Sequence, residues 1–209
     1  QPPVAAGENG EKPGPGPAAE PGETPEAAPG ATDPALVEGM PVAVPPPADS
    51  EIVVDSPERR IRWILDKWGG SLKQVEFKEY TDRPGQDPAN PENWYRLVSK
   101  HLVEKGSTHS PRMLAVDIVD ENGRTVLRTS KVMWELVGEN DDRVTFRLDM
   151  PAAGAALVKE FGFPRAVEGI EGGAWHLDLN LRLEVTDAAK AAKFGAEAWR
   201  VRMTGPSGI

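Results

Sequence analysis

Residues 175–185, WHLDLNLRLEV, carry the clearest pattern of hydrophobic and polar positions in the chain. From His176 onward, polar and apolar residues alternate without interruption. The apolar row consists of Leu177, Leu179, Leu181, Leu183 and Val185. The polar row consists of His176, Asp178, Asn180, Arg182 and Glu184. Successive side chains of a β-strand point to opposite faces, so this alternation predicts a strand with one buried face. We expect the leucine row to pack against a second sheet.

The same period of two recurs along most of the chain after Pro57. It places Ile61, Trp63 and Leu65 on one face, and it continues through residues 71–80, 113–128, 132–149 and 155–161. We count about nine or ten short strands joined by turns rich in Gly, Pro, Asn and Asp. Strands with one apolar face must cover that face with another sheet. The sequence therefore predicts an all-β protein, an antiparallel β-sandwich or barrel.

Several turns can be placed between these strands. Gly69-Gly70 interrupts one pair of runs, and Asn122-Gly123 lies between two β-prone runs, where both residues tolerate the positive φ of a type I′ hairpin turn. Residues 138–142, GENDD, predict a further turn. Residues 81–94 contain three prolines and predict an extended, solvated loop. Residues 186–194 fit either one short helix or a loop.

The first 50 residues have a different composition from the rest. Pro, Ala and Gly fill about 30 of these positions, and large apolar residues are almost absent. Such a segment cannot bury enough apolar surface to offset the entropy lost on ordering. We therefore interpret residues 1–50 as a disordered acidic linker and residues 51–209 as one domain.

Charge and cysteine content exclude some function classes. The linker holds about −7 of the formal net charge of −9, which leaves the domain near neutral and without the basic patch of a nucleic-acid-binding protein. The absence of cysteine excludes disulfides and thiolate metal sites. No run approaches the length of a transmembrane helix, and no signal-peptide pattern is present. The abrupt start of the linker suggests that an anchor precedes it.

The ionisable residues predict no catalytic or metal site. The three histidines, His101, His109 and His176, fit neither a catalytic triad nor the HExxH pattern of a zinc site. The acidic stretches at 120–123 and 139–142 are too short for a calcium loop and are explained by hairpin turns. We predict neither an enzyme nor a cofactor or metal.

Three aromatic residues remain as candidates for a cleft or a partner contact. Trp94 lies in the 81–94 loop, and Trp175 and His176 open the alternating strand. For Trp94 a role as a lid on the core competes with contact to a sugar or a partner, and for His176 simple exposure to solvent competes with a place in a cleft. Trp63, Trp134, Trp175 and Trp199 lie in or beside strand patterns, which favours places in the core or on its rim.

Three segments and a short C-terminal motif, in order, resemble the periplasmic domain of the YidC family of membrane protein insertases. Residues 60–80 resemble its first hairpin, with Gly69, Gly70, Leu72 and Tyr80 at the matching positions. Residues 143–164 resemble the next landmark, where Lys159 and Phe161 match, and residues 175–187 resemble the strand that follows. Residues 205–209, GPSGI, resemble a Gly-Pro-x-Gly motif of that family, with Gly205, Pro206 and Gly208.

The resemblance implies a β-supersandwich similar to galactose mutarotase. It also implies a non-catalytic, accessory domain at the periplasmic face of the bacterial inner membrane. The full-length protein would be anchored in the membrane outside this chain, and its partners would be Sec translocon components and nascent membrane proteins. The shared fold leaves open a mutarotase-like sugar epimerase with His176 as the base, or a carbohydrate- or peptide-binding sandwich without catalysis.

The resemblance also predicts that the domain is incomplete. Family domains continue past the Gly-Pro-x-Gly motif, whereas this chain ends there. Half a sandwich would leave sheet edges and part of an apolar face uncovered. We therefore expect either poor autonomous stability or a missing continuation.

Overall fold

The computed structural model of the chain describes residues 38–56, 59–97, 112–164 and 176–204. These residues form eleven β-strands, one short α-helix and several single 3₁₀ turns. The strands are β1 Glu51–Val54, β2 Ile61–Asp66, β3 Ser71–Thr81, β4 Trp94–Arg96, β5 Val116–Val119, β6 Thr125–Leu127, β7 Glu135–Asn140, β8 Arg143–Met150, β9 Ala155–Gly162, β10 Asp178–Val185 and β11 Arg200–Met203. The helix α2 covers Ala188–Phe194. The prediction of an all-β antiparallel fold is confirmed.

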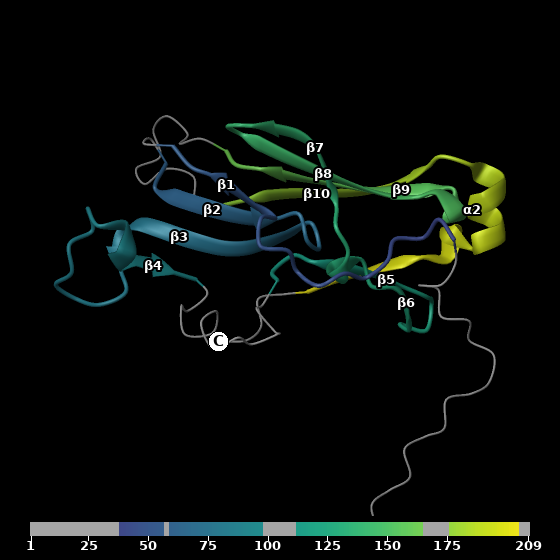
Figure 1. Cartoon of the computed structure of the whole chain (residues 1–209), viewed down its shortest axis with the longest axis horizontal. Coiled ribbons are helices and arrows are strands. Elements are labelled where there is room, and N and C mark those ends of the chain that lie inside the picture. Colours follow the sequence, from purple (N-terminus) through teal and green to yellow (C-terminus); the bar gives the residue numbers. More distant parts are fainter. Residues whose placement is uncertain (1–37, 57–58, 98–111, 165–175, 205–209) are drawn as a thin grey trace, which may run out of the picture. The chain divides into compact units, whose positions relative to one another are not determined.

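The strands form three antiparallel sheets (Figure 1). One four-stranded sheet has the order β1-β2-β3-β4, a second has the order β10-β9-β8-β7, and a three-stranded sheet has the order β11-β5-β6. Two isolated bridges link this part of the fold to other segments: Trp68 of the β2–β3 turn pairs with Met133, and Leu72 at the start of β3 pairs with Met113. The β2–β3 turn and the start of β3 are therefore connected to the segments that precede β7 and β5.

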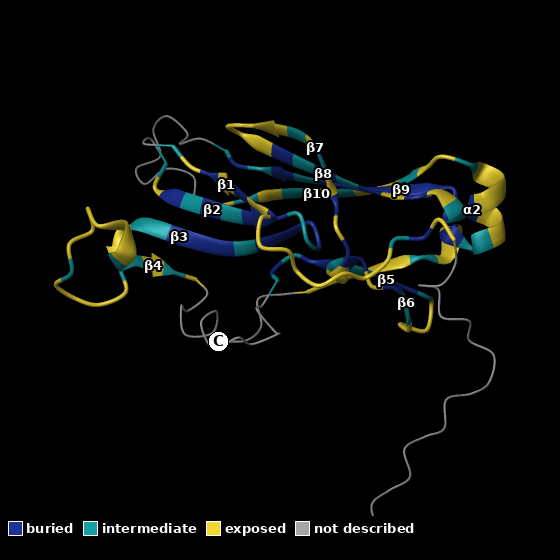
Figure 2. Ribbon diagram, viewed as in Figure 1, coloured by how far each residue is buried: buried dark blue, intermediate teal, exposed yellow. Residues whose placement is uncertain are grey.

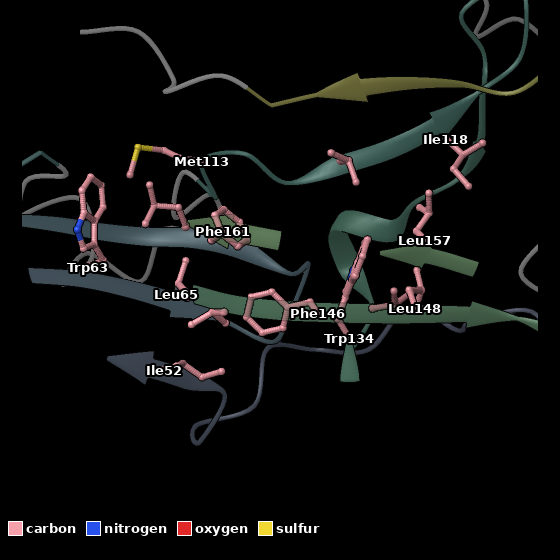
Figure 3. Close-up of a cluster of buried hydrophobic side chains, with 14 of the residues drawn as sticks. Ile52, Trp63, Leu65, Met113, Ile118, Trp134, Phe146, Leu148, Leu157 and Phe161 are labelled. Carbon is pink, nitrogen blue, oxygen red and sulfur yellow. The ribbon is translucent and has the colours of Figure 1, made fainter. Parts of the chain in front are cut away.

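A single apolar cluster receives side chains from all three sheets (Figure 3). Phe146 and Phe161, which are both fully buried, meet edge to face with ring centroids 6.0 Å apart. The labelled neighbours in this core include Trp63, Leu65, Ile118, Trp134, Leu148 and Leu157. Rows of this kind were predicted from the period of two, and they supply the core of the sandwich.

Strand β10 forms as predicted, but its leucine row is only partly covered. Leu177, Leu179 and Leu181 pack against the core as half-buried side chains. Leu183 and Val185 are 40% and 59% exposed. β10 is the first strand of its sheet, and the burial of the leucine row decreases toward its C-terminal end. The expectation of a fully packed leucine face is therefore wrong at its C-terminal end.

The two predicted glycine turns exist, and one has a different conformation from that expected. Gly69 and Gly70 both have positive φ, and they connect β2 with β3. Asn122 and Gly123 connect β5 with β6, but only Gly123 has positive φ, so the turn is not type I′. The Asp120 carboxylate accepts hydrogen bonds from the Asn122 and Arg124 amides, which selects this other turn. Gly205, Pro206 and Gly208 lie outside the described residues.

The domain starts before the predicted boundary. Strand β1 begins at Glu51 as expected, yet residues 38–50 also contact the sheets. Met40 is buried in the core. The Val44 amide donates a hydrogen bond to the Lys131 carbonyl, and the Val44 carbonyl accepts one from the indole of Trp68. Residues 1–37 of the predicted linker lie outside the described residues. Residues 186–194, which fitted a helix or a loop, form α2 between an Asp187 N-cap and a Gly195 C-cap.

Candidate functional site

Trp94 is held inside its own loop. It starts β4, is half-buried, and donates a hydrogen bond from Nε1 to the Pro88 carbonyl at 2.8 Å. The Lys78 Nζ lies 5.7 Å from the ring centroid. The loop before it is mostly exposed, as predicted, but ends in a 3₁₀ turn over Pro91–Asn93. Because its only polar donor is already used, Trp94 acts here as an anchor of the loop.

The other two candidates do not join Trp94 in a common site. His176 is exposed and precedes β10, an edge strand of a different sheet from β4. Trp175 lies outside the described residues. A surface depression of about 310 Å³ contains neither Trp94 nor His176. Its lining residues are Gly39, Met40, Pro41, Met133, Glu135, Arg147, Leu148 and Asp149.

Two of the charged residues that line this depression, Arg147 and Asp149, are engaged in surface ion pairs. Arg147 donates hydrogen bonds to Asp149 at 2.8 Å and to Glu184 at 2.7 Å. These hydrogen bonds raise the pKa of Arg147, and the bond from Arg147 lowers the pKa of Glu184. Both side chains remain ionised at neutral pH, so neither is prepared to transfer a proton.

Within the described ranges, the structure assembles no group of three potential metal-ligating side chains. Over the same residues, no helix has the length and apolarity needed to cross a membrane.

The most unusual ionisable residue is Lys159, which sequence reasoning assigned only to a strand. It belongs to β9 and has no exposed surface. Its Nζ donates hydrogen bonds to the carbonyls of Gly70 at 2.7 Å and Leu114 at 2.9 Å. It also lies 4.8 Å from the centroid of the Trp134 ring. Burial lowers the pKa of Lys159 to about 7, although the negative charge of Asp117 opposes the shift.

The contacts of Lys159 suit a structural role. Two carbonyls and an aromatic face offer one acceptor for each of the three protons of an ammonium group. The lysine side chain has no exposed surface, and its amine is held by these contacts within the core. The sequence does contain a signal for this site, because Ala155, Leu157, Lys159 and Phe161 share one face of β9. A lysine in an apolar row is the pattern that identifies it.

A second buried charge also serves the fold. Glu76 of β3 is 4% exposed and accepts a hydrogen bond from Arg96 Nε at 2.7 Å. Arg62 Nη1 lies 3.3 Å from its other oxygen. Glu76 therefore connects β3 to both neighbouring strands, β2 and β4. Its charge is balanced by two arginines and is explained by strand cohesion.

The surface feature that stands out is a group of three aromatic side chains and one leucine on and beside the β3–β4 pair. We call these residues, Phe77, Tyr80, Tyr95 and Leu97, the aromatic patch. The Phe77 ring lies 5.8 Å from Tyr95 and 6.5 Å from Tyr80, measured between centroids. Tyr80 and Tyr95 are 56% and 43% exposed, and Leu97 is 36% exposed. Figure 2 shows β4 and its loop as one of the more exposed regions of the sheet.

Tyrosine is enriched in protein–protein interfaces because it combines a large apolar ring with a hydroxyl group. The patch is therefore suited to contact another protein. It lies beside the predicted candidate Trp94, but sequence reasoning did not identify it. The period of two placed Phe77 on the buried face and gave no indication that Tyr95 would pair with it across the strands.

Comparison of the chain with protein-family models, with curated proteins and with solved structures gives no match in any of the three.

Proposed function

We propose that this chain is a periplasmic interaction domain of a bacterial membrane protein insertase of the YidC family, and that it binds other proteins and catalyses no reaction. The full-length protein would be integral to the inner membrane. Its partners would be Sec translocon components and nascent membrane proteins.

The aromatic patch is the observation that carries the proposed binding role. It offers exposed tyrosines on a rigid pair of strands, because Glu76 and Arg96 hold β4 against β3 through a hydrogen bond of 2.7 Å. A rigid aromatic surface binds with little loss of side-chain entropy. The most deeply buried charges, by contrast, are used within the fold.

The order of the resembling segments supports the proposed family. Residues 60–80 contain β2, the Gly69-Gly70 turn and β3, and residues 143–164 contain β8 and β9. Residues 175–187 contain β10, the next strand along the chain and the neighbour of β9 in the sheet. The first two segments are thus each a pair of adjacent antiparallel strands, and the third is a single strand. The proposal further predicts coding sequence for one hydrophobic span before Gln1 and for five after Ile209.

Site-specific photo-crosslinking in the full-length protein tests the binding role. A photoreactive phenylalanine analogue replaces Tyr95 in one variant and Val137 of β7 in the control. Both side chains are similarly exposed, at 43% and 48%. We expect the Tyr95 position to crosslink to a translocon subunit or to a nascent membrane protein, and the Val137 position to give background. Equal crosslinking at both positions contradicts the proposed surface.

Ligand titration separates this proposal from a sugar-binding sandwich. Tryptophan fluorescence of the 209-residue chain is measured with oligosaccharides and, separately, with unfolded peptides. We expect peptides to change the fluorescence and Tyr80→Ser/Tyr95→Ser to weaken that change. A response to saccharides alone would favour the carbohydrate-binding alternative and overturn the proposal.

A further inference from the structure

The outer edge of β10 has no partner strand among the described residues. β10 is the terminal strand of its sheet and pairs with β9 on its other side, in unbroken register from Asp178–Gly162 to Val185–Ala155. Natural edge strands are usually protected by proline, by a bulge or by a charge that points inward. β10 has none of these, because its inward row is Leu179, Leu181, Leu183 and Val185.

The polar row of β10 is complementary to itself. It consists of Asp178, Asn180, Arg182 and Glu184, and His176, two residues ahead of the strand, continues the alternation. In an antiparallel pair, residues directly opposite share a face. If two copies meet with Asn180 opposite Asn180, then Arg182 faces Asp178 of the second copy, and Glu184 faces His176. The two-fold axis makes each of these contacts twice.

We propose that β10 pairs with β10 of a second copy of this chain, antiparallel and with Asn180 at the two-fold axis. The two four-stranded sheets then become one continuous sheet across the dimer. On the apolar face, Leu183 lies opposite Leu177 of the second copy, which covers part of the exposed end of the leucine row. This surface is separate from the aromatic patch, so the proposal goes beyond the proposed function and does not depend on it.

The charge pattern excludes the neighbouring registers. With the axis at Leu181, Asp178 of each copy faces Glu184 of the other. With the axis at Arg182, the two copies of Arg182 face each other. Like charges directly opposite destabilise a pair of strands. With the axis at Leu183, Arg182 faces Glu184, but the apolar Leu179 faces Asp187, the N-cap of α2, and the pairing runs into the helix. Asn180 is therefore the centre that pairs opposite charges and also keeps the leucines opposite one another.

A charge swap tests the pairing by sedimentation equilibrium on the 209-residue chain. Arg182→Asp and Asp178→Arg each convert two opposite-charge contacts into two like-charge contacts. We expect each single variant to weaken dimerisation by about ten-fold or more, and the double variant to restore it. The control Glu139→Arg lies on β7, the other edge of the same sheet, and should leave the dimer unchanged. Circular dichroism checks that each variant is folded.

Cysteine crosslinking tests the register, because the natural chain has no cysteine. Asn180→Cys places two thiols opposite each other at the axis, within the Cβ separation a disulfide needs. We expect Asn180→Cys to oxidise to a covalent dimer much faster than Arg182→Cys or Asp178→Cys. Equal rates for the three variants overturn the register. A wild-type chain that stays monomeric at about 1 mM overturns the proposal itself, and leaves the edge to a strand from another protein.

Discussion

The ammonium group of Lys159 lies 4.8 Å from the centre of the Trp134 ring, in a core that excludes water from both side chains. Trp134 is fixed in turn, since its Nε1 donates a hydrogen bond to the Thr129 carbonyl at 3.0 Å. Lys159 extends from β9 to the β2–β3 turn at Gly70 and to Leu114 ahead of β5. One side chain therefore links parts of all three sheets.

This position predicts an unusual dependence of stability on pH. Burial lowers the pKa of Lys159 from 10.5 to about 7 in the folded state. Between these values the unfolded chain binds a proton that the folded chain does not, so raising the pH favours folding. We expect the free energy of unfolding of the wild type to rise, relative to that of Lys159→Met, by up to about 1.4 kcal/mol per pH unit. The rise begins near pH 7 and is complete above pH 10.5.

Urea unfolding of both proteins at several pH values between 7 and 10 measures this difference. Comparison with Lys159→Met removes the titration of the other groups, which the two proteins share. A difference that does not change with pH would mean that the carbonyls and the Trp134 ring keep the ammonium charged throughout, and would contradict the lowered pKa.

Gly70 is predicted to tolerate no side chain. Its φ is +48°, and a Cβ atom there would lie 2.8 Å from Cδ2 of Trp134. Gly70→Ala therefore adds a steric conflict with a fixed ring to the cost of positive φ. We expect a loss of about 2 to 4 kcal/mol in the free energy of unfolding.

Gly123→Ala is the matched control for that experiment. Gly123 also has positive φ, +77°, but a Cβ atom there would meet nothing within 4 Å. We expect a loss of only about 1 kcal/mol, from the backbone conformation alone. Similar losses at both glycines in denaturant unfolding would show that the contact with Trp134 adds nothing.

The sequence predicts most of the strands because burial in this fold follows the period of two. β2, β8 and β9 place the expected apolar rows in the core. The extent of coverage is not encoded in that period. Nothing in the β10 pattern indicates that Leu183 and Val185 are exposed. Composition was equally misleading for residues 38–50, where one large side chain, Met40, attaches an otherwise linker-like segment to the core.

The candidate site was harder to predict than the fold. Trp94 and His176 attract attention as residue types, but Trp94 lies on one edge strand and His176 precedes an edge strand of a different sheet, and these places depend on long-range pairing. Lys159 shows the opposite case. The sequence shows that Lys159 shares an apolar row of β9. Its hydrogen-bond acceptors are the backbone carbonyls of Gly70 and Leu114, and because every residue has a carbonyl, the residue types cannot identify these partners.

The N-cap of α2 gives a further prediction. The Asp187 carboxylate accepts hydrogen bonds from the amides of Ala189 and Lys190, both at 3.1 Å. Asp187→Ala removes the oxygen that accepts both hydrogen bonds, and we expect a loss of about 1 kcal/mol in thermal or urea unfolding. Asp187→Asn keeps a capping oxygen and is the control, with a smaller loss expected. Equal losses for the two variants would show that the negative charge, and not the cap, stabilises this turn.

Glu76 gives the last prediction, which concerns the support of the aromatic patch. Its carboxylate is 5% exposed and holds Arg96 of β4, whose side chain is 12% exposed. Glu76→Gln keeps an acceptor oxygen but removes the negative charge that balances a largely buried guanidinium, so we expect a loss of about 2 to 4 kcal/mol. The loss should be concentrated in β4, and hydrogen exchange of the Tyr95 and Arg96 amides should accelerate more than that of β8.

Glu79→Gln is the control, because Glu79 and Arg60 form an exposed pair that contributes at most about 0.5 kcal/mol. If Glu76→Gln behaves like Glu79→Gln, the ion pair does not hold β4, and the rigidity that we assign to the aromatic patch must come from the strand pairing alone.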